Sequence, residues 1–106
     1  MEQSMTADAY FDELFPPDAE LKRVNEAIKA AGMPEISVAP GYGRLLTMLV
    51  TVSGASKVLE IGALGGYSGI CLARGLPASG RLVSLELRAD YAAIAEANVA
   101  AAGYGS

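Results

Sequence analysis

The chain has 106 residues, a formal net charge of −4, only eight Lys and Arg, and 52% hydrophobic residues. This length supports one hydrophobic core rather than two domains, and the acidic charge predicts neither a nucleic-acid partner nor membrane attachment, since both favour a basic surface. No histidine is present and Cys71 is the only cysteine, which excludes His-dependent catalysis, His-ligated zinc and an internal disulfide.

The first part of the chain predicts helices. Aromatic and leucine residues at helical spacing indicate a helix over 6–15, closed by Pro16-Pro17. Asp18 is a natural N-cap for a second helix reaching about Ala31. The buried stripe expected on that second helix consists of Leu21, Val24 and Ile28.

Residues 33–40 read as an extended linker, because a residue that precedes proline is biased away from helix. A third helix is expected over about 41–52, ending at Ser53-Gly54. Its periodicity predicts a buried face formed by Leu45, Leu46, Leu49 and Val52.

From Lys57 the pattern becomes strand, helix, strand, helix. The expected elements are a strand over 57–61, a helix over about 66–76, a strand over 81–86 and a helix over about 89–102. A crossover of this length requires parallel strands and a right-handed connection, which predicts an α/β fold. Cys71 falls inside the first of these two helices and is expected to fill the core.

Both strands are apolar on both faces, as strands buried within a larger parallel sheet are. In a doubly wound domain the first strand has a neighbour on each side, and this sequence supplies only one of them. We therefore expect a fragment or truncated product, with an N-terminal helical segment over 1–56 and the βαβα first half of a doubly wound parallel sheet over 57–106.

A glycine-rich turn follows the first strand. Parallel α/β proteins bind nucleotide-like cofactors at such a turn, and a strand-end carboxylate such as Glu86 can accept hydrogen bonds from ribose hydroxyls. A dinucleotide fingerprint would need a second glycine where Leu64 stands, so a nicotinamide-dependent dehydrogenase is a weak hypothesis. The segment instead reads Glu60-Ile-Gly62-Ala-Leu-Gly65-Gly-Tyr67-Ser68.

These residues resemble the class I S-adenosylmethionine-dependent methyltransferases, specifically the metal-dependent O-methyltransferases related to catechol and caffeoyl-CoA O-methyltransferases. The resemblance rests on residues 58–68, on Leu72-Ala73-Arg74, on Glu86, and upstream on 36–38 and 43–46. It covers most of residues 10–103. It implies a Rossmann-like fold and the N-terminal half of an enzyme that methylates a hydroxyl of a small, aromatic acceptor.

The resemblance also implies roles for individual residues. Ser68 and the first helical turn would hold the methionine carboxylate, while Gly62 and Gly65 would let the cofactor lie against bare backbone. Glu60 would orient the loop or face the cationic end of the cofactor, and Glu86 would bind the ribose. The remaining expected contacts are Leu64, the wall residue Tyr67, and Val38 in the segment that lies over the cofactor.

Simpler interpretations stay open for three of these residues. The alternative for Ser68 is an ordinary helix cap, and the alternative for Glu86 is a solvated carboxylate at a strand end. For Glu60, a structural role and a functional role are equally supported. The family's divalent metal, commonly magnesium, is held by residues of later strands, so no metal ligand and no catalytic residue can be named here.

The acidic start of the chain lacks the basic region of a signal peptide, which predicts a cytoplasmic protein. A homo-oligomer that acts on a small hydroxylated acceptor is also expected. The alternative function is a non-enzymatic half-domain that assembles through its open strand edge.

Overall fold

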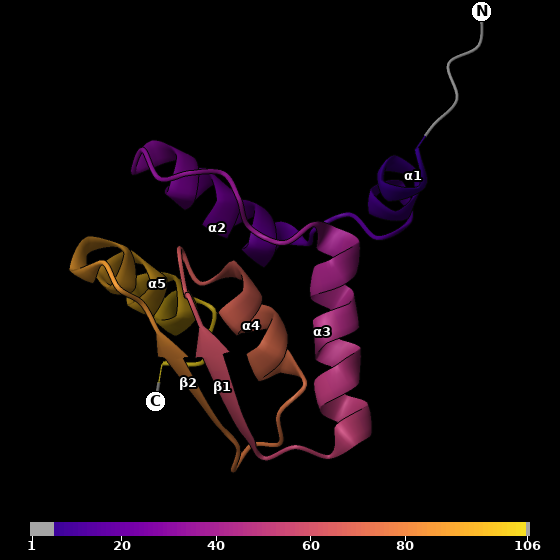
Figure 1. The fold of residues 1–106 in the computed structure, drawn as a ribbon, viewed down its shortest axis with the longest axis vertical. Coiled ribbons are helices and arrows are strands. Elements are labelled where there is room, and N and C mark those ends of the chain that lie inside the picture. The colour runs from indigo at the N-terminus through magenta and orange to yellow at the C-terminus, as the bar shows by residue number, and fades with distance from the viewer. Residues whose placement is uncertain (1–5, 106) are drawn as a thin grey trace, which may run out of the picture.

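The computed structural model describes residues 6–105 and arranges them as helices on a short parallel sheet (Figure 1). Every element expected from the sequence is present, with bounds within two residues of expectation. The elements are α1 (Ala7–Leu14), α2 (Ala19–Ala30), α3 (Pro40–Ser53), β1 (Lys57–Ile61), α4 (Tyr67–Arg74), β2 (Arg81–Leu85) and α5 (Ala89–Ala101).

Local side-chain chemistry explains where the N-terminal helices begin and end. The side chain of Thr6 accepts a hydrogen bond from the Ala9 N–H, and that of Asp18 accepts one from the Leu21 N–H. Pro40 occupies the first turn of α3, where its missing N–H costs nothing. Gly54 ends α3 in the left-handed region with φ of 67°.

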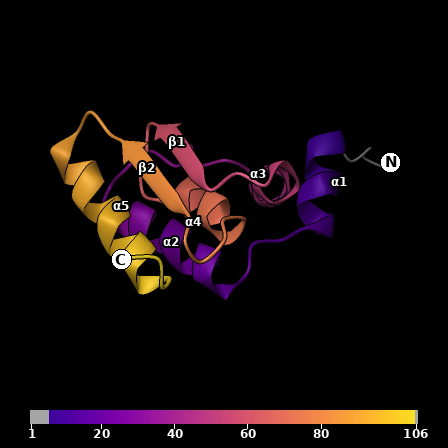
Figure 2. The ribbon, with the colours of Figure 1, turned by 90° about the horizontal axis from the view of Figure 1, so that it is seen from below.

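The two strands pair in parallel, with Leu59 opposite Val83 and Ile61 opposite Leu85. The helices α2, α3, α4 and α5 lie on one side of this sheet (Figure 2). The sheet therefore has one covered face, and the carboxyl ends of both strands point toward the start of α4 and of α5.

The hydrophobic core lies between α2 and α4. Its buried members come from both sides of residue 56, so the N-terminal helices and the βαβα unit share one core; they are Leu21, Val24, Ile28, Met33, Tyr67, Ile70 and Cys71. The three residues expected to form the stripe of α2 and the expected burial of Cys71 are confirmed.

The predicted buried face of α3 is wrong at three of its four residues, while Leu46 is half-buried and packs against the core as expected. Leu45, Leu49 and Val52 are exposed, Val52 to 85%, whereas Gly41, Gly43 and Val50 are buried. The reason is close helix approach: the Phe11 ring lies against Gly41, and a Cβ on Gly43 would meet the sulfur of Cys71 at 2.9 Å. The glycines form the closest contact, and Leu45, Leu49 and Val52 lie on the exposed side of α3.

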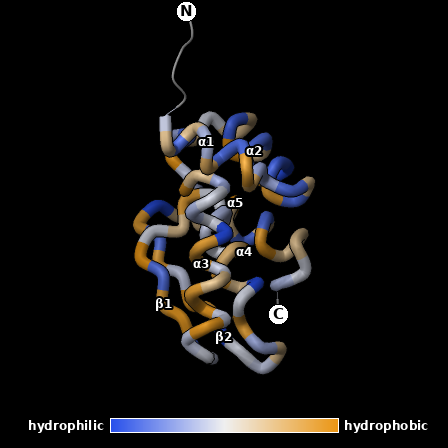
Figure 3. Tube along the Cα trace, turned by 90° about the vertical axis from the view of Figure 1, so that its right-hand side faces the viewer, coloured by the Kyte–Doolittle hydropathy of each residue, from blue (hydrophilic) through white to orange (hydrophobic). Residues whose placement is uncertain are grey.

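The face of the sheet away from the helices is apolar and exposed. Both strands contain hydrophobic stretches (Figure 3). The exposed apolar residues on this face are Leu59, Ile61, Val83 and Leu85. Their exposed fractions range from 45% to 75%. The expectation that these strands have apolar residues on both faces is confirmed, and within residues 6–105 one face has no covering layer.

The fold predicts different effects on stability for two glycine-to-alanine substitutions. A Cβ on Gly65 would lie 2.3 Å from Cγ1 of Ile28, so Gly65→Ala forces the packing of α2 apart and should reduce the free energy of unfolding by about 1–3 kcal/mol. Gly69→Ala is the matched control, because its Cβ would make ordinary contacts of 3.5 Å or longer inside a helix. Urea denaturation measures both, and equal stability of the two variants would contradict the packing described.

A second prediction concerns alkaline pH. Burial raises the pKa of the Cys71 thiol from 9.0 to about 11. Between these values the unfolded chain loses the thiol proton and the folded chain keeps it, so ionisation favours unfolding and the free energy of unfolding should fall as pH rises from 9 to 11. Cys71→Ala should lack this contribution. A stability difference between wild type and variant that stays constant over this range would contradict the prediction.

Candidate functional site

The turn between β1 and α4 adopts a conformation that its sequence permits. Gly62 and Gly66 have φ of 90° and 94°, in the left-handed region that glycine enters without strain. Among the residues that the structure describes, Leu64 is the one residue other than glycine in that region, with φ of 47°. The N–H of Gly66 donates to the carbonyl of Ala63 at 3.0 Å and closes the turn.

A cavity of about 410 Å³ opens beside this turn. Its walls come from the segment after α2, from the turn, from the first residues of α4, from the end of β2 and from the first turn of α5. It is lined by Pro34, Ile36, Ser37, Val38, Gly62, Ala63, Leu64, Tyr67, Ser68, Glu86 and Tyr91. Six of the eight residues expected to contact a cofactor therefore line one cavity: Val38, Gly62, Leu64, Tyr67, Ser68 and Glu86.

Glu86 lies at the carboxyl end of β2 and is bound to the turn. Its Oε1 accepts a hydrogen bond from the Leu64 N–H at 2.9 Å, and its Oε2 accepts one from the Arg88 N–H at 3.0 Å. Hydrogen bonds from these backbone N–H groups, with that from Arg88 as the largest contribution, hold the pKa of the Glu86 carboxyl below its usual value. The side chain is therefore an anion at neutral pH, and its remaining lone pairs can accept further hydrogen bonds.

Glu60 lies behind the cavity rather than in its wall. It is 9% exposed and accepts hydrogen bonds from the hydroxyl groups of Ser68 and, at 2.9 Å, Ser84. These bonds compensate the cost of burying its charge. The Ser68 hydroxyl, which lines the cavity, is thus directed toward Glu60 in this structure.

Gly65 also lies outside the cavity lining. It is buried, and the space that a side chain would need is filled by Ile28 of α2. Its small size therefore serves helix packing on the far side of the turn.

Tyr67 borders the cavity but is only 2% exposed, with an edge of its ring close to Gly43. Burial raises the pKa of its phenol to about 12, so the hydroxyl stays protonated.

Tyr91 is a cavity residue that the sequence motifs do not predict. It lines the cavity, and the guanidinium of Arg88 stacks 4.2 Å from the centre of its ring. The signal was its position five residues after Glu86, in the first turn of α5, because α5 starts at the same edge of the sheet where the glycine turn lies.

A hollow of about 500 Å³ lies near Phe15, Arg44 and Arg74, and no residue of the glycine turn lines it. No group of three or more His, Cys, Asp or Glu in residues 6–105 is placed to hold a metal ion. In the same part of the chain, no helix has the length and hydrophobicity needed to cross a bilayer.

Comparison with known proteins identifies the family of this architecture. The O-methyltransferase family profile matches residues 12–106. A catechol O-methyltransferase of Niastella koreensis is 42% identical over 103 residues, which are 95% of this chain and 46% of that protein.

Two solved structures are also similar. An O-methyltransferase from Bacillus cereus in complex with SAH superposes with a TM-score of 0.86 at 43% identity, covering 92% of this chain and 45% of that one. The O-methyltransferase TomG from Streptomyces achromogenes, in complex with SAM, gives a TM-score of 0.82 at 38% identity, covering 92% and 44%. The fold is therefore Rossmann-like, and the chain spans about half the length of the relatives it matches. The profile match and these relatives show that the chain belongs to the O-methyltransferase family.

Proposed function

We propose that this chain forms the methyl-donor half of an S-adenosylmethionine-dependent O-methyltransferase. The observation that carries the proposal is that the Glu86 carboxylate and the bare backbone of Gly62 face one cavity at the carboxyl ends of the strands. Ligands of open α/β sheets bind at that edge. The parent enzyme would transfer the methyl group to a hydroxyl of a small aromatic acceptor and act as a cytoplasmic homo-oligomer.

The chemistry of the cavity fits the donor part by part. Two vicinal ribose hydroxyls can both donate to the ionised Glu86, which is already fixed by the Leu64 and Arg88 N–H groups. Nothing lies within 4 Å of a Cβ built on Gly62, so the nucleoside can lie directly on the backbone there. Val38 lines the same cavity.

The methionine end of the donor would lie at the start of α4. The first N–H groups of a helix have no intrahelical partner, and α4 has no side-chain cap, so its N-terminus favours a carboxylate. Rotation of the Ser68 hydroxyl away from Glu60 would add another donor. Glu60 would then supply negative charge near the cationic end of the ligand.

The donor supplies an electrophilic methyl group on its sulfonium, and these residues bind and orient it. The residues that the structure describes do not fit a metal centre, because no three or more His, Cys, Asp or Glu side chains lie close enough together to hold a metal ion. We therefore assign the divalent metal, which we propose to be magnesium, to a part of the parent enzyme outside this sequence. The acceptor site and the base that deprotonates the acceptor hydroxyl are assigned to the same part.

The exposed face of the sheet also supports the proposal that this chain forms one half of a larger enzyme. Leu59, Ile61, Val83 and Leu85 form an exposed apolar surface on the two strands, and the relatives that this chain matches are about twice its length. Burying such a surface is favourable by about 25 cal/mol for each Å² removed from water. The remainder of an O-methyltransferase domain is the partner that this surface fits.

The exposed face also favours a second candidate, a non-enzymatic half-domain that assembles through the open edge of β1. Sedimentation at micromolar concentration separates the two functions. Self-association with no affinity for S-adenosylmethionine supports the second candidate, and a monomer that binds the donor excludes it.

Glu86→Gln tests the donor site. The substitution replaces the anionic two-point acceptor by a neutral amide, so affinity for S-adenosylhomocysteine should fall about tenfold or more. Asp90→Asn is the matched control, since Asp90 is an exposed acid that pairs with Arg88 outside the cavity lining. Calorimetric titration measures both variants; equal affinities would rule out ribose binding by Glu86.

The division of labour predicts the behaviour of the 106-residue chain itself. With magnesium, S-adenosylmethionine and catechol it should bind the donor without transferring a methyl group, because it supplies no acceptor site. Chromatographic detection of methylated catechol measures the outcome, with the Niastella koreensis relative as the positive control. Turnover by the purified chain would contradict the proposal.

A further inference from the structure

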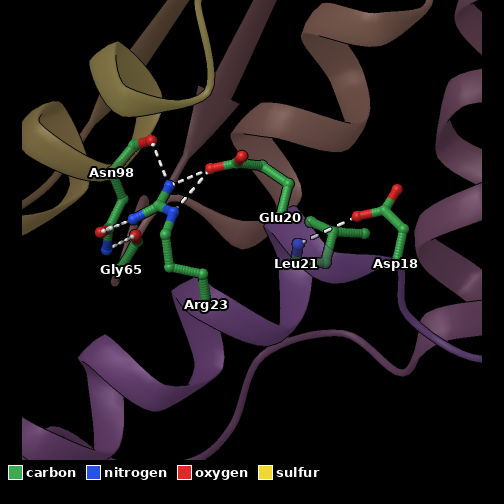
Figure 4. Close-up of polar contacts among 6 residues, drawn as sticks. All are labelled: Asp18, Glu20, Leu21, Arg23, Gly65 and Asn98. Carbon is green, nitrogen blue, oxygen red and sulfur yellow. Dashed lines mark hydrogen bonds and ion pairs between the residues drawn. The ribbon is translucent and has the colours of Figure 1, made fainter.

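Asn98 of α5 is a buried polar side chain that holds the glycine turn from behind. It is 5% exposed, and its Nδ2 donates a hydrogen bond to the carbonyl of Gly65 at 2.9 Å (Figure 4). Burial of an amide is costly unless its polar atoms find partners. Both polar atoms of this side chain do, because its Oδ1 accepts a hydrogen bond from Nη1 of Arg23 at 3.2 Å.

Arg23 of α2 fixes which way this amide points. A guanidinium group can only donate, so the oxygen of the Asn98 amide must face Arg23 and the NH₂ group must face Gly65. Arg23 also donates through Nη2 to the backbone carbonyl of Asn98 at 3.1 Å. Glu20 in turn accepts from Nε of Arg23 at 2.7 Å, so the guanidinium is held on two sides.

The turn needs such a constraint because Gly65 and Gly66 are consecutive glycines. The plane of the peptide that joins them can flip by about 180°, through paired changes of ψ at Gly65 and φ at Gly66, without a clash from a Cβ of either residue. That rotation would reverse the Gly65 carbonyl and the Gly66 N–H, and it would break the bond from Gly66 to the Ala63 carbonyl. The peptide directly precedes α4, whose first N–H groups belong to the proposed donor site.

We propose that Asn98, oriented by Arg23, is a positioning residue that selects one orientation of the Gly65–Gly66 peptide and so keeps the turn competent for donor binding. The inference rests on the proposed function for its effect on affinity. Its structural part, the choice of peptide orientation, stands without any ligand. Arg23 of α2 and Asn98 of α5 are 75 residues apart along the chain. Their hydrogen bonds connect both helices to the turn.

Asn98→Asp separates orientation from packing. The variant has almost the same shape and keeps an acceptor for Arg23, but it places a carboxylate oxygen against the Gly65 carbonyl where a donor stood. The chain should remain folded, while S-adenosylhomocysteine affinity falls about tenfold. Without ligand, the ¹H–¹⁵N resonance of Gly66 should broaden or double as the peptide samples both orientations. Arg23→Lys should give a smaller change of the same kind, because an ammonium group cannot reproduce both contacts.

Ile94→Ala is the control. Ile94 lies on the same helix and packs on the core, so its truncation destabilises α5 and leaves the hydrogen bond from Asn98 to the Gly65 carbonyl in place. This variant should lose stability in urea while its Gly66 resonance stays single. An unchanged Gly66 resonance in Asn98→Asp would overturn the inference, as would an equal change in Ile94→Ala. Absence of donor binding in the wild type, with the Gly66 effect intact, would instead refute the proposed function and leave the positioning role standing.

Discussion

The structure depends on the close packing of one turn, residues 62–66, between helices on either side. Ile28 of α2 fills the space where Gly65 has no side chain, and a Cβ on Gly66 would meet the Ala95 carbonyl of α5 at 3.0 Å. Such contacts leave room only for the hydrogen atoms of glycine, so both position 65 and position 66 require this residue. Because the turn is held in this way, its opposite surface stays open and becomes the wall of a cavity.

The charges around the turn follow from the same arrangement. Parallel strands end at one edge of the sheet, so Glu60 and Glu86 both come close to the turn. Their environments differ: Glu60 is buried and bound to two serine hydroxyls, while Glu86 is bound to backbone N–H groups and lines the cavity. One carboxylate thus supports the site from inside, and the other is available to a ligand.

Much of this arrangement could be predicted from the sequence because local signals agreed with tertiary structure. The N-cap at Asp18, the stop at Gly54 and the strand-turn-helix at residues 57–68 are encoded within a few residues of each other. The contact face of α3 could not be predicted, since the leucine spacing favours one face and only the approach of α1 and α4 shows that Gly41 and Gly43 form it. Tyr91, Asn98 and Arg23 were missed for a related reason: an aromatic, an amide or an arginine on a helix resembles a surface residue until the fold places it against the turn.

The central claim is that the cavity beside the turn is the methyl-donor site of this O-methyltransferase chain. Chemical-shift mapping with ¹H–¹⁵N spectra during titration with S-adenosylhomocysteine tests it most directly. The account predicts saturable changes that are largest at Gly62, Leu64, Ser68 and Glu86. Changes centred instead on the hollow beside Phe15 and Arg44, or no saturable change at all, would contradict it.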